Sequence, residues 1–190
     1  MRKDVEMSKE QLRCICEGAI FIAAALALSY LKIPIGLSFG GFGGSIDLVM
    51  IPLIFFAVRW GLGWGLGAGL IFGTLKYFFA GGFAITWQSM LLDYSLAYMM
   101  VGLAGVMKNR KWGLVTGALV GCIGRFAIHF VSGITIYAMY MPEQFLKMTM
   151  TNAWIYSLLY NSTYMLPNTV IAVAVGAAIS VPLSKYVQRT

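Results

Sequence analysis

The sequence predicts an all-α integral membrane protein with six transmembrane helices and both termini on the cytosolic side. Of the 190 residues, 59% are hydrophobic and 11% are charged, whereas soluble domains are about 25% charged. The mean hydropathy is +0.79. A soluble chain of this length could not bury so much apolar surface, but a bilayer can solvate it. Because about 20 apolar residues cross a bilayer as a helix, the chain has room for roughly six spans.

The apolar stretches define the helices in order, within a single transmembrane domain covering residues 1–190. We place the spans at about 12–31, 47–58, 61–80, 87–107, 112–140 and 153–181. The first follows a polar start without a small-residue cleavage site, so we expect no cleavable signal peptide. The second ends before Arg59, and Gly81 breaks the chain after the third. The fourth ends before the basic cluster at Lys108, which separates it from the fifth.

A glycine-rich segment, GLSFGGFGGS at 36–45, separates the first two spans. Its backbone is too flexible and too polar to face lipid. We expect loop 32–46 to fold over a binding site as a lid that includes Phe39 and Phe42. The alternative is that it serves only as a linker.

Lysine and arginine are distributed unevenly between the predicted loops. With a cytosolic N-terminus, only Lys32 and Lys147 lie outside, and an odd number of spans would scramble the bias. The inner face then carries Arg2, Lys3, Lys9, Arg13, Arg59, Lys108, Arg110, Lys111, Lys185 and Arg189. The net charge of +7 therefore reflects membrane orientation, and we expect no nucleic-acid partner. Lys76 and Arg125 remain within spans, and we interpret both as structural.

Two helices carry small residues at intervals of four, which lets helices approach closely in lipid. The third span has Gly61, Gly65, Gly69 and Gly73, and the first has Ala19, Ala23 and Ala27. Both stripes can pack within the chain. The alternative for the alanines is docking on another membrane subunit.

Ionisable groups inside a bilayer are costly and are functional candidates. Those in the predicted spans, with two strongly polar amides, are Asp47, Lys76, Asp93, Arg125, His129, Asn161 and Asn168. Asp93 could instead form an internal ion pair with Arg125 or Lys76 that only stabilises the fold. His129 could be an interior histidine whose hydrogen bonds are all made within the protein. Asp47 favours a position at a helix N-terminus, where an acid suits the dipole.

Polar and aromatic residues gather toward the outer half of three helices. Asp93 and Tyr94 are in the fourth span and His129 is in the fifth, while the sixth contributes Tyr156, Ser157, Tyr160, Asn161 and Tyr164. A carboxylate, an imidazole, an amide and several rings suit a small, flat, cationic molecule. We find no nucleophile–base pair, metal-ligand pattern or phosphate loop, so we expect neither an enzyme nor a cofactor or metal site.

Four segments carry a family resemblance that extends over nearly the whole chain: SIDLVMIPLIFFAVRWGL (45–62), WQSMLLDYSLAYMMVGLAG (87–105), GRFAIHFVSG (124–133) and WIYSLLYNSTYMLPN (154–168). In these segments the chain resembles the ThiT family, the thiamine-specific substrate-binding components of energy-coupling factor transporters. The resemblance implies six helices and an outward-facing thiamine pocket in a bacterial plasma membrane.

The resemblance also implies roles for particular residues. Asp93, His129, Tyr156 and Asn161 would contact thiamine, Tyr94 would face its thiazolium ring, and Tyr137 would add an aromatic wall. Phe83 and Phe72 stand where the family has a tyrosine and a tryptophan, and Asp93 replaces a glutamate. Tyr156 and Asn161 are about 140° apart on an ideal helix, so the pocket must wrap around that helix.

Partners follow from the same resemblance. Ala19, Ala23 and Ala27 would dock on a transmembrane coupling subunit, and two cytosolic ATPase subunits would supply the energy. Alternatives are a binding component for riboflavin, a pyridoxine-like compound or a pyrimidine, a proton-coupled carrier that uses Asp93 and His129, and a small intramembrane enzyme. Proton-coupled carriers usually contain inverted repeats, and the sequence shows no internal repeat, which argues against the carrier.

Overall fold

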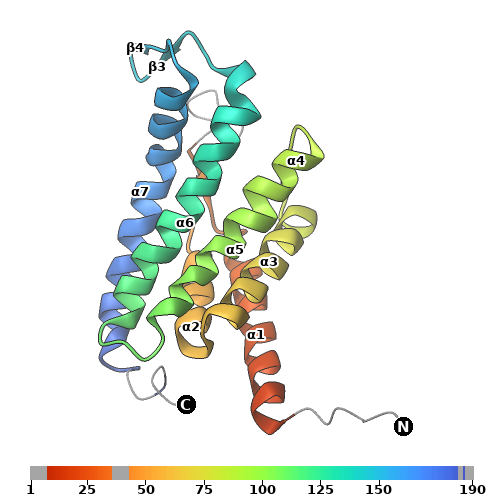
Figure 1. Ribbon diagram of the computed structural model, residues 1–190, viewed down its shortest axis with the longest axis vertical. Helices are drawn as coiled ribbons and strands as arrows, with labels where there is room; N and C mark the ends of the chain where they lie inside the picture. The colour runs from red at the N-terminus through yellow and green to blue at the C-terminus, as the bar shows by residue number, and fades with distance from the viewer. Residues whose placement is uncertain (1–7, 36–42, 184–185, 187–190) are drawn as a thin grey trace.

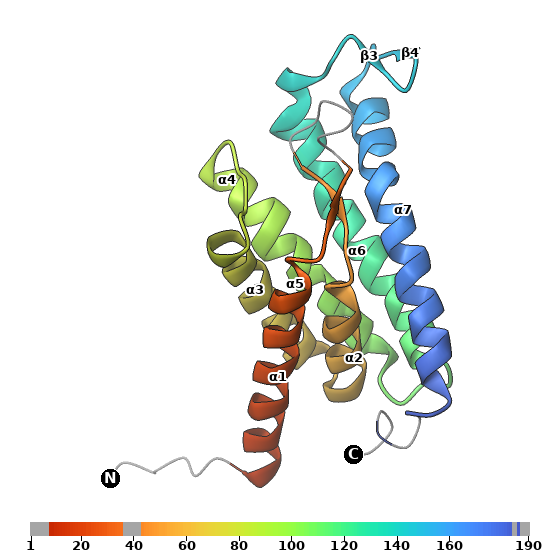
Figure 2. The same cartoon turned by 180° about the vertical axis from the view of Figure 1, so that it is seen from behind.

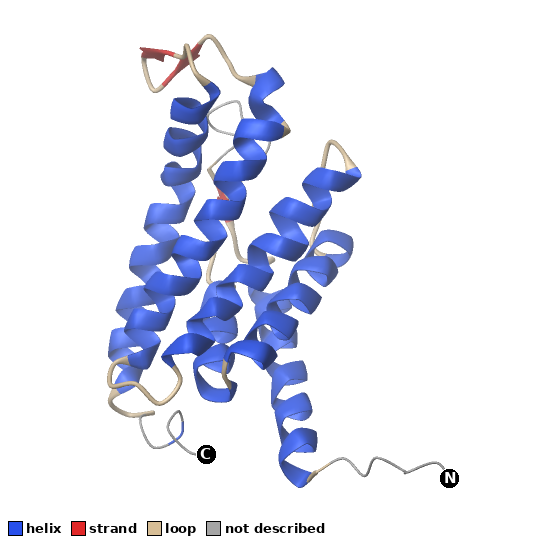
Figure 3. Ribbon diagram, viewed as in Figure 1, coloured by secondary structure: helices blue, strands red, loops and turns tan. Residues whose placement is uncertain are grey.

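The computed structural model describes residues 8–35, 43–183 and 186, and most of them are helical (Figure 3). The long helices are α1 (Lys9–Leu28), α3 (Leu62–Phe79), α6 (Gly113–Thr135) and α7 (Ala153–Ser180), with a shorter α2 (Met50–Trp60). The predicted fourth span is a composite of α4 (Trp87–Met90), η2 (Leu91–Leu96), α5 (Ala97–Val101) and η3 (Gly102–Met107). A short turn of helix, η4 (Tyr137–Tyr140), follows α6. The prediction of a helical membrane protein is confirmed.

The helices form an elongated bundle in which the start of α1 and the end of α7 lie at the same end (Figure 1). Four helical stretches in the described chain are long and apolar enough to cross a membrane: Lys9–Leu28, Trp87–Met107, Gly113–Thr135 and Ala153–Ser180. Because the first and the last helix begin and end on the same side of the bundle, the chain crosses it an even number of times, as predicted. These features are those of a multi-pass helical membrane protein.

The second helical segment is shorter than a bilayer is thick. The eleven residues of α2 rise only about 16 Å, about half of the hydrocarbon core. Extended chain completes the crossing, because β2 (Ser45–Ile46) pairs antiparallel with β1 (Ile33–Pro34) just before α2. This hairpin lies among the helices (Figure 2), where Asn168 of α7 donates to the Ser45 carbonyl at 2.8 Å. Non-helical backbone is thus held by protein at this depth, as lipid requires.

The central part of the predicted lid falls outside the described residues. Residues 36–42, including Phe39 and Phe42, belong to that part of the chain. The described remainder forms the stem of the hairpin, and Ile35 extends it by donating to the Gly44 carbonyl at 3.2 Å. A second hairpin, β3 (Gln144–Phe145) with β4 (Met148–Thr149), joins η4 to α7 at the opposite end from the termini.

The glycine stripe packs α3 closely against the composite helix. A Cβ added at Gly69 would lie 2.1 Å from the Tyr98 carbonyl oxygen, and one at Gly73 would lie 2.2 Å from that of Tyr94. The intramolecular interpretation of this stripe is confirmed. The alanine stripe differs, because Ala19, Ala23 and Ala27 are all exposed on α1.

Candidate functional site

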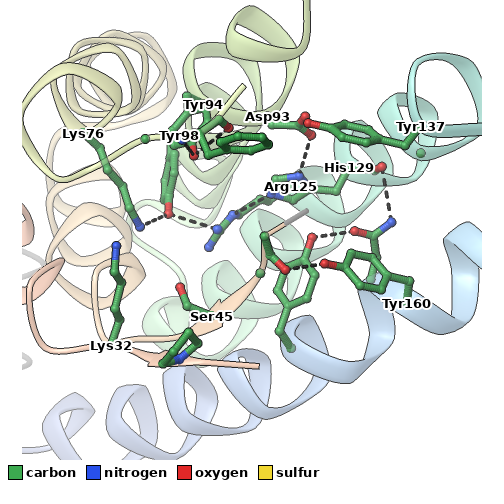
Figure 4. A pocket seen from close by; sticks show the side chains of 18 of the residues that line it. Lys32, Ser45, Lys76, Asp93, Tyr94, Tyr98, Arg125, His129, Tyr137 and Tyr160 are labelled. Atoms are coloured by element: carbon green, nitrogen blue, oxygen red, sulfur yellow. Dashed lines mark hydrogen bonds and ion pairs between the residues drawn. The ribbon is translucent and has the colours of Figure 1, made fainter. Parts of the chain in front are cut away.

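A cavity of about 640 Å³ opens between the composite helix, α6, α7 and the β1–β2 hairpin. Many of its lining residues belong to the β1–β2 hairpin, η2, the second half of α6 and the first half of α7, which lie in the half of the bundle away from the start of α1 and the end of α7 (Figure 1). Tyrosine is its most frequent lining residue, and Figure 4 shows a few charged groups projecting inward from separate helices. Seven tyrosines of the described chain line the cavity: Tyr94, Tyr98, Tyr137, Tyr140, Tyr156, Tyr160 and Tyr164.

Asp93 occupies η2, where a π-type turn widens the helix. Such turns recur at functional sites. One carboxylate oxygen lies 3.0 Å from His129 Nδ1, and the other accepts from Ser132 Oγ at 2.9 Å. The alternative that Asp93 pairs with Arg125 or Lys76 is therefore wrong. Its side chain remains 16% exposed, so the carboxylate faces the cavity while both oxygens are positioned by α6.

His129 is fixed from both sides. Arg125 Nε donates to His129 Nε2 at 3.3 Å, so Nε2 must be an acceptor and the proton lies on Nδ1, toward Asp93. The hydrogen-bond network thus assigns a neutral imidazole whose Nδ1 proton is directed at the Asp93 carboxylate. A neutral histidine adds no positive charge beside this carboxylate, which is free to attract a cationic ligand.

Lys76 and Arg125 also line the cavity, together with the phenol that joins them. Lys76 Nζ lies 3.1 Å from Asp47 Oδ2 and donates to Tyr98 Oη at 2.6 Å, while Arg125 Nη2 donates to the same hydroxyl at 2.9 Å. Asp47 Oδ1 accepts from the backbone N–H of Val49 at the start of α2. Asp47 therefore holds the N-terminal position that its sequence context favours, and is ion-paired as well.

Helix α7, the predicted sixth span, supplies an aromatic wall and one amide. Tyr156, Tyr160 and Tyr164 follow at intervals of four on α7 and contact one another in sequence. Asn161 Nδ2 donates to the Ser157 carbonyl at 2.8 Å, and Asn161 Oδ1 accepts from Tyr164 Oη at 2.5 Å. Tyr156 and Asn161 both line the cavity, which therefore extends around this part of α7.

The structure brings seven of the eight sequence-predicted ligand residues to the cavity: Asp93, Tyr94, His129, Tyr137, Tyr156, Asn161 and Phe83. Phe83 is 55% exposed, and its backbone N–H donates to Tyr94 Oη at 2.8 Å. Phe72 is not among the lining residues. It is fully buried edge-on against Tyr98 at 4.8 Å, so its predicted ligand contact is corrected to support of the cavity wall.

The sequence interpretation missed other lining residues. The sequence predicts structural roles for Lys76 and Arg125 and an outer-face position for Lys32, yet all three line the cavity together with Tyr98. A signal existed for Tyr98, because it follows Tyr94 by one helical turn and so shares its face. The described residues contain no group of three or more histidine, cysteine or acidic residues that could hold a metal.

Comparisons with known proteins agree with this architecture. The model of the family described as "Thiamine transporter protein" matches residues 15–188. The thiamine transporter ThiT of Bacillus subtilis is 32% identical over 189 residues, covering 90% of this chain and 91% of the relative. That of Lacticaseibacillus paracasei is 29% identical over 197 residues, covering 95% and 93%. A solved structure of ThiT from Listeria monocytogenes shares the fold, with a TM-score of 0.75 at 24% identity over 93% of this chain and 96% of that one.

Proposed function

This chain belongs to the thiamine transporter protein family, and from that premise we propose that it is the thiamine-binding subunit of an importer driven by ATP hydrolysis in separate subunits. In this proposal the cavity faces the outside of the cell and captures thiamine. The basic residues at the opposite end, among them Arg59, Lys108 and Lys111, are on the cytosolic side.

The observation that carries the proposal is a carboxylate held at the wall of a tyrosine-lined cavity. Asp93 is fixed by His129 and Ser132, so it meets a ligand without first having to become ordered, which favours affinity. A thiazolium ring carries a positive charge that attracts both a carboxylate and the faces of aromatic rings. Tyr94 and Tyr137 lie beside Asp93 in the cavity lining (Figure 4). The volume of about 640 Å³ accommodates a molecule of this size.

Energy coupling needs partners in this proposal. The chain sequence has no nucleotide-binding loop, whereas α1 presents Ala19, Ala23 and Ala27 on an exposed face. Small residues allow a partner helix to approach the backbone closely in lipid. We assign this face to a transmembrane coupling subunit, with two cytosolic ATPase subunits beneath it.

Calorimetry on the purified protein in detergent tests the binding assignment. We expect thiamine to bind, and Asp93→Asn to weaken binding about 100-fold, because a charge-assisted contact contributes about 1.5–3 kcal/mol. His129→Ala should also weaken it, because Asp93 then loses one of its two partners. Lys111→Gln, an exposed residue at the opposite end, is the matched control. Unchanged affinity in both site variants would reject this site, and tighter binding of riboflavin, pyridoxine or a free pyrimidine would reject thiamine as the ligand.

A further inference from the structure

Positive charge exceeds negative charge around the cavity. Lys32, Lys76 and Arg125 line it, whereas Asp93 is the one acid among the described lining residues. Asp47 pairs with Lys76 from behind the wall, and one cation is still left over. Arg125 is 5% exposed and takes part in none of the ion pairs found in the described chain. A buried charge without a counter-charge is costly, and a bound thiamine cation would add to the imbalance.

Hydrogen-bond donors are in excess at the same place. Tyr98 Oη accepts from both Lys76 and Arg125, so both its lone pairs are occupied and its own proton must be donated elsewhere. Lys76 uses two of its three N–H donors, on Asp47 and Tyr98. Arg125 Nη1 is buried and has no hydrogen-bond partner among the residues that the structure describes. Within the described chain, no acceptor meets these donors.

The three cations are close neighbours. Lys76 and Arg125 share one hydroxyl oxygen, and Lys32 Nζ donates at 3.3 Å to the carbonyl of Ala80, the residue whose N–H bonds back to Lys76. Figure 4 shows the amino groups of Lys32 and Lys76 and the Arg125 guanidinium turned toward the same part of the cavity, with the Ser45 side chain nearby. Asp93 is positioned apart from them, beyond His129.

We propose that the cavity contains a second, anion-binding subsite formed by Arg125, Lys76, Tyr98 and Lys32, in addition to the cation-binding subsite at Asp93. An anionic group there accepts the donors that the protein leaves unused and offsets the surplus charge when the cationic vitamin binds. The group is either a free inorganic anion or a phosphate ester on the vitamin itself. The charge balance rests on the proposed function, whereas the unused donors do not.

The subsite can be tested first without thiamine. Melting of the purified protein is compared in chloride, in inorganic phosphate and in gluconate at equal ionic strength, since a ligand that binds only the folded state raises the melting temperature. We expect chloride or phosphate to stabilise the wild type and the Lys111→Gln control relative to gluconate. Arg125→Gln should lose this dependence on the anion, and Arg125→Lys should keep part of it.

Calorimetry then distinguishes the two sources of the anion. A free anion predicts that thiamine binds about tenfold tighter in chloride or phosphate than in gluconate. A ligand-borne anion predicts that thiamine monophosphate binds tighter than thiamine in gluconate, and that Arg125→Gln removes this difference. If wild-type melting and both affinities are the same in every medium, and the phosphate ester gives no gain, the subsite does not exist. If thiamine fails to bind in all media while the anion-dependent melting persists, the proposed function fails and the anion subsite stands.

Discussion

The intramembrane charges of this protein form one continuous network rather than separate pairs. Hydrogen bonds link, in order, Ser132, Asp93, His129, Arg125, Tyr98, Lys76 and Asp47. The network runs from α6 through the composite helix to α3 and the start of α2. The network therefore connects Asp93, the carboxylate proposed to hold the ligand, to Asp47 directly after β2. Lipid offers no alternative hydrogen-bond partner to any of these groups.

The buried pair of Lys76 and Asp47 gives the first prediction at this scale. Both side chains are almost inaccessible, at 8% and 0% exposure. Replacing Lys76 by Met leaves Asp47 charged and unpaired, and breaking such a pair costs about 3–5 kcal/mol. We expect a clearly lower melting temperature in detergent for Lys76→Met. The double variant Lys76→Met/Asp47→Asn should recover part of the loss, and a double variant no better than the single one would contradict the pairing.

At the residue scale, the sequence predicted which side chains are important better than which pairs they form. Asp93, His129 and Asn161 were identified because ionisable and amide groups are expensive in lipid. The choice of His129 over Arg125 as the partner of Asp93 depends on how far α6 is shifted along its axis relative to η2, because the two residues lie one turn apart on the same face of α6. No local pattern encodes this shift. The predicted ligand contact of Phe72 is not found for a related reason, since the burial of Phe72 behind Tyr98 depends on how α3 packs against the composite helix.

At the element scale, close approach of α3 to the composite helix shapes one side of the cavity. Gly73 faces the Tyr94 carbonyl and Gly69 faces that of Tyr98, so the backbone positions of two cavity residues depend on the missing side chains of α3. Lys76 is one turn further along the same helix. The glycines therefore position the site as well as stabilise the bundle.

Alanine substitutions along α3 test this close packing with an internal control. Gly69→Ala places a methyl group 2.1 Å from a carbonyl oxygen, and such overpacking costs about 1–3 kcal/mol. Gly67→Ala on the same helix meets nothing within 4 Å and should be neutral or slightly stabilising, because alanine is the better helix former by about 1 kcal/mol. Thermal melting and thiamine titration should both separate the two variants, and equal effects would show that the helices are not in close contact here.

The limits of the spans were predictable, but the irregular parts were not. Apolar length and basic loops gave the six segments, and Gly61, with a φ of 96°, supplies the break between α2 and α3. The short second segment was part of the 47–58 prediction and matches α2, but the β1–β2 stem was not predicted, because a two-residue strand has no periodicity to detect. The π-type turn at Asp93 likewise has no signal in helix propensity or hydrophobic period.

At the scale of the whole molecule, the two ends have different chemistry. The cavity occupies one end, and the other is tied together by Glu17 of α1, which accepts from Arg59 Nε at 2.6 Å and from Trp60 Nε1 at 2.9 Å. This contact holds the lower part of α1 against the end of α2. The exposed alanine face just above Glu17 is therefore presented on a rigid helix, as a docking surface requires.

Bulky substitutions on that face should separate capture of the vitamin from its import. Ala23 is exposed on α1 and is not among the residues that line the cavity, so Ala23→Leu should leave thiamine affinity unchanged in calorimetry. In cells that contain the coupling and ATPase subunits, uptake of labelled thiamine should fall at least about tenfold, because a larger side chain prevents close helix approach. Ala127→Leu, which changes another exposed alanine on α6, makes the same chemical change on a different helix and should retain uptake.

Loss of uptake in both variants would point to a general effect of bulk in the membrane, and retention in both would remove the α1 face as the docking surface. A result confined to Ala23 would show that binding is a property of this chain alone, whereas transport needs a second membrane protein placed against its first helix.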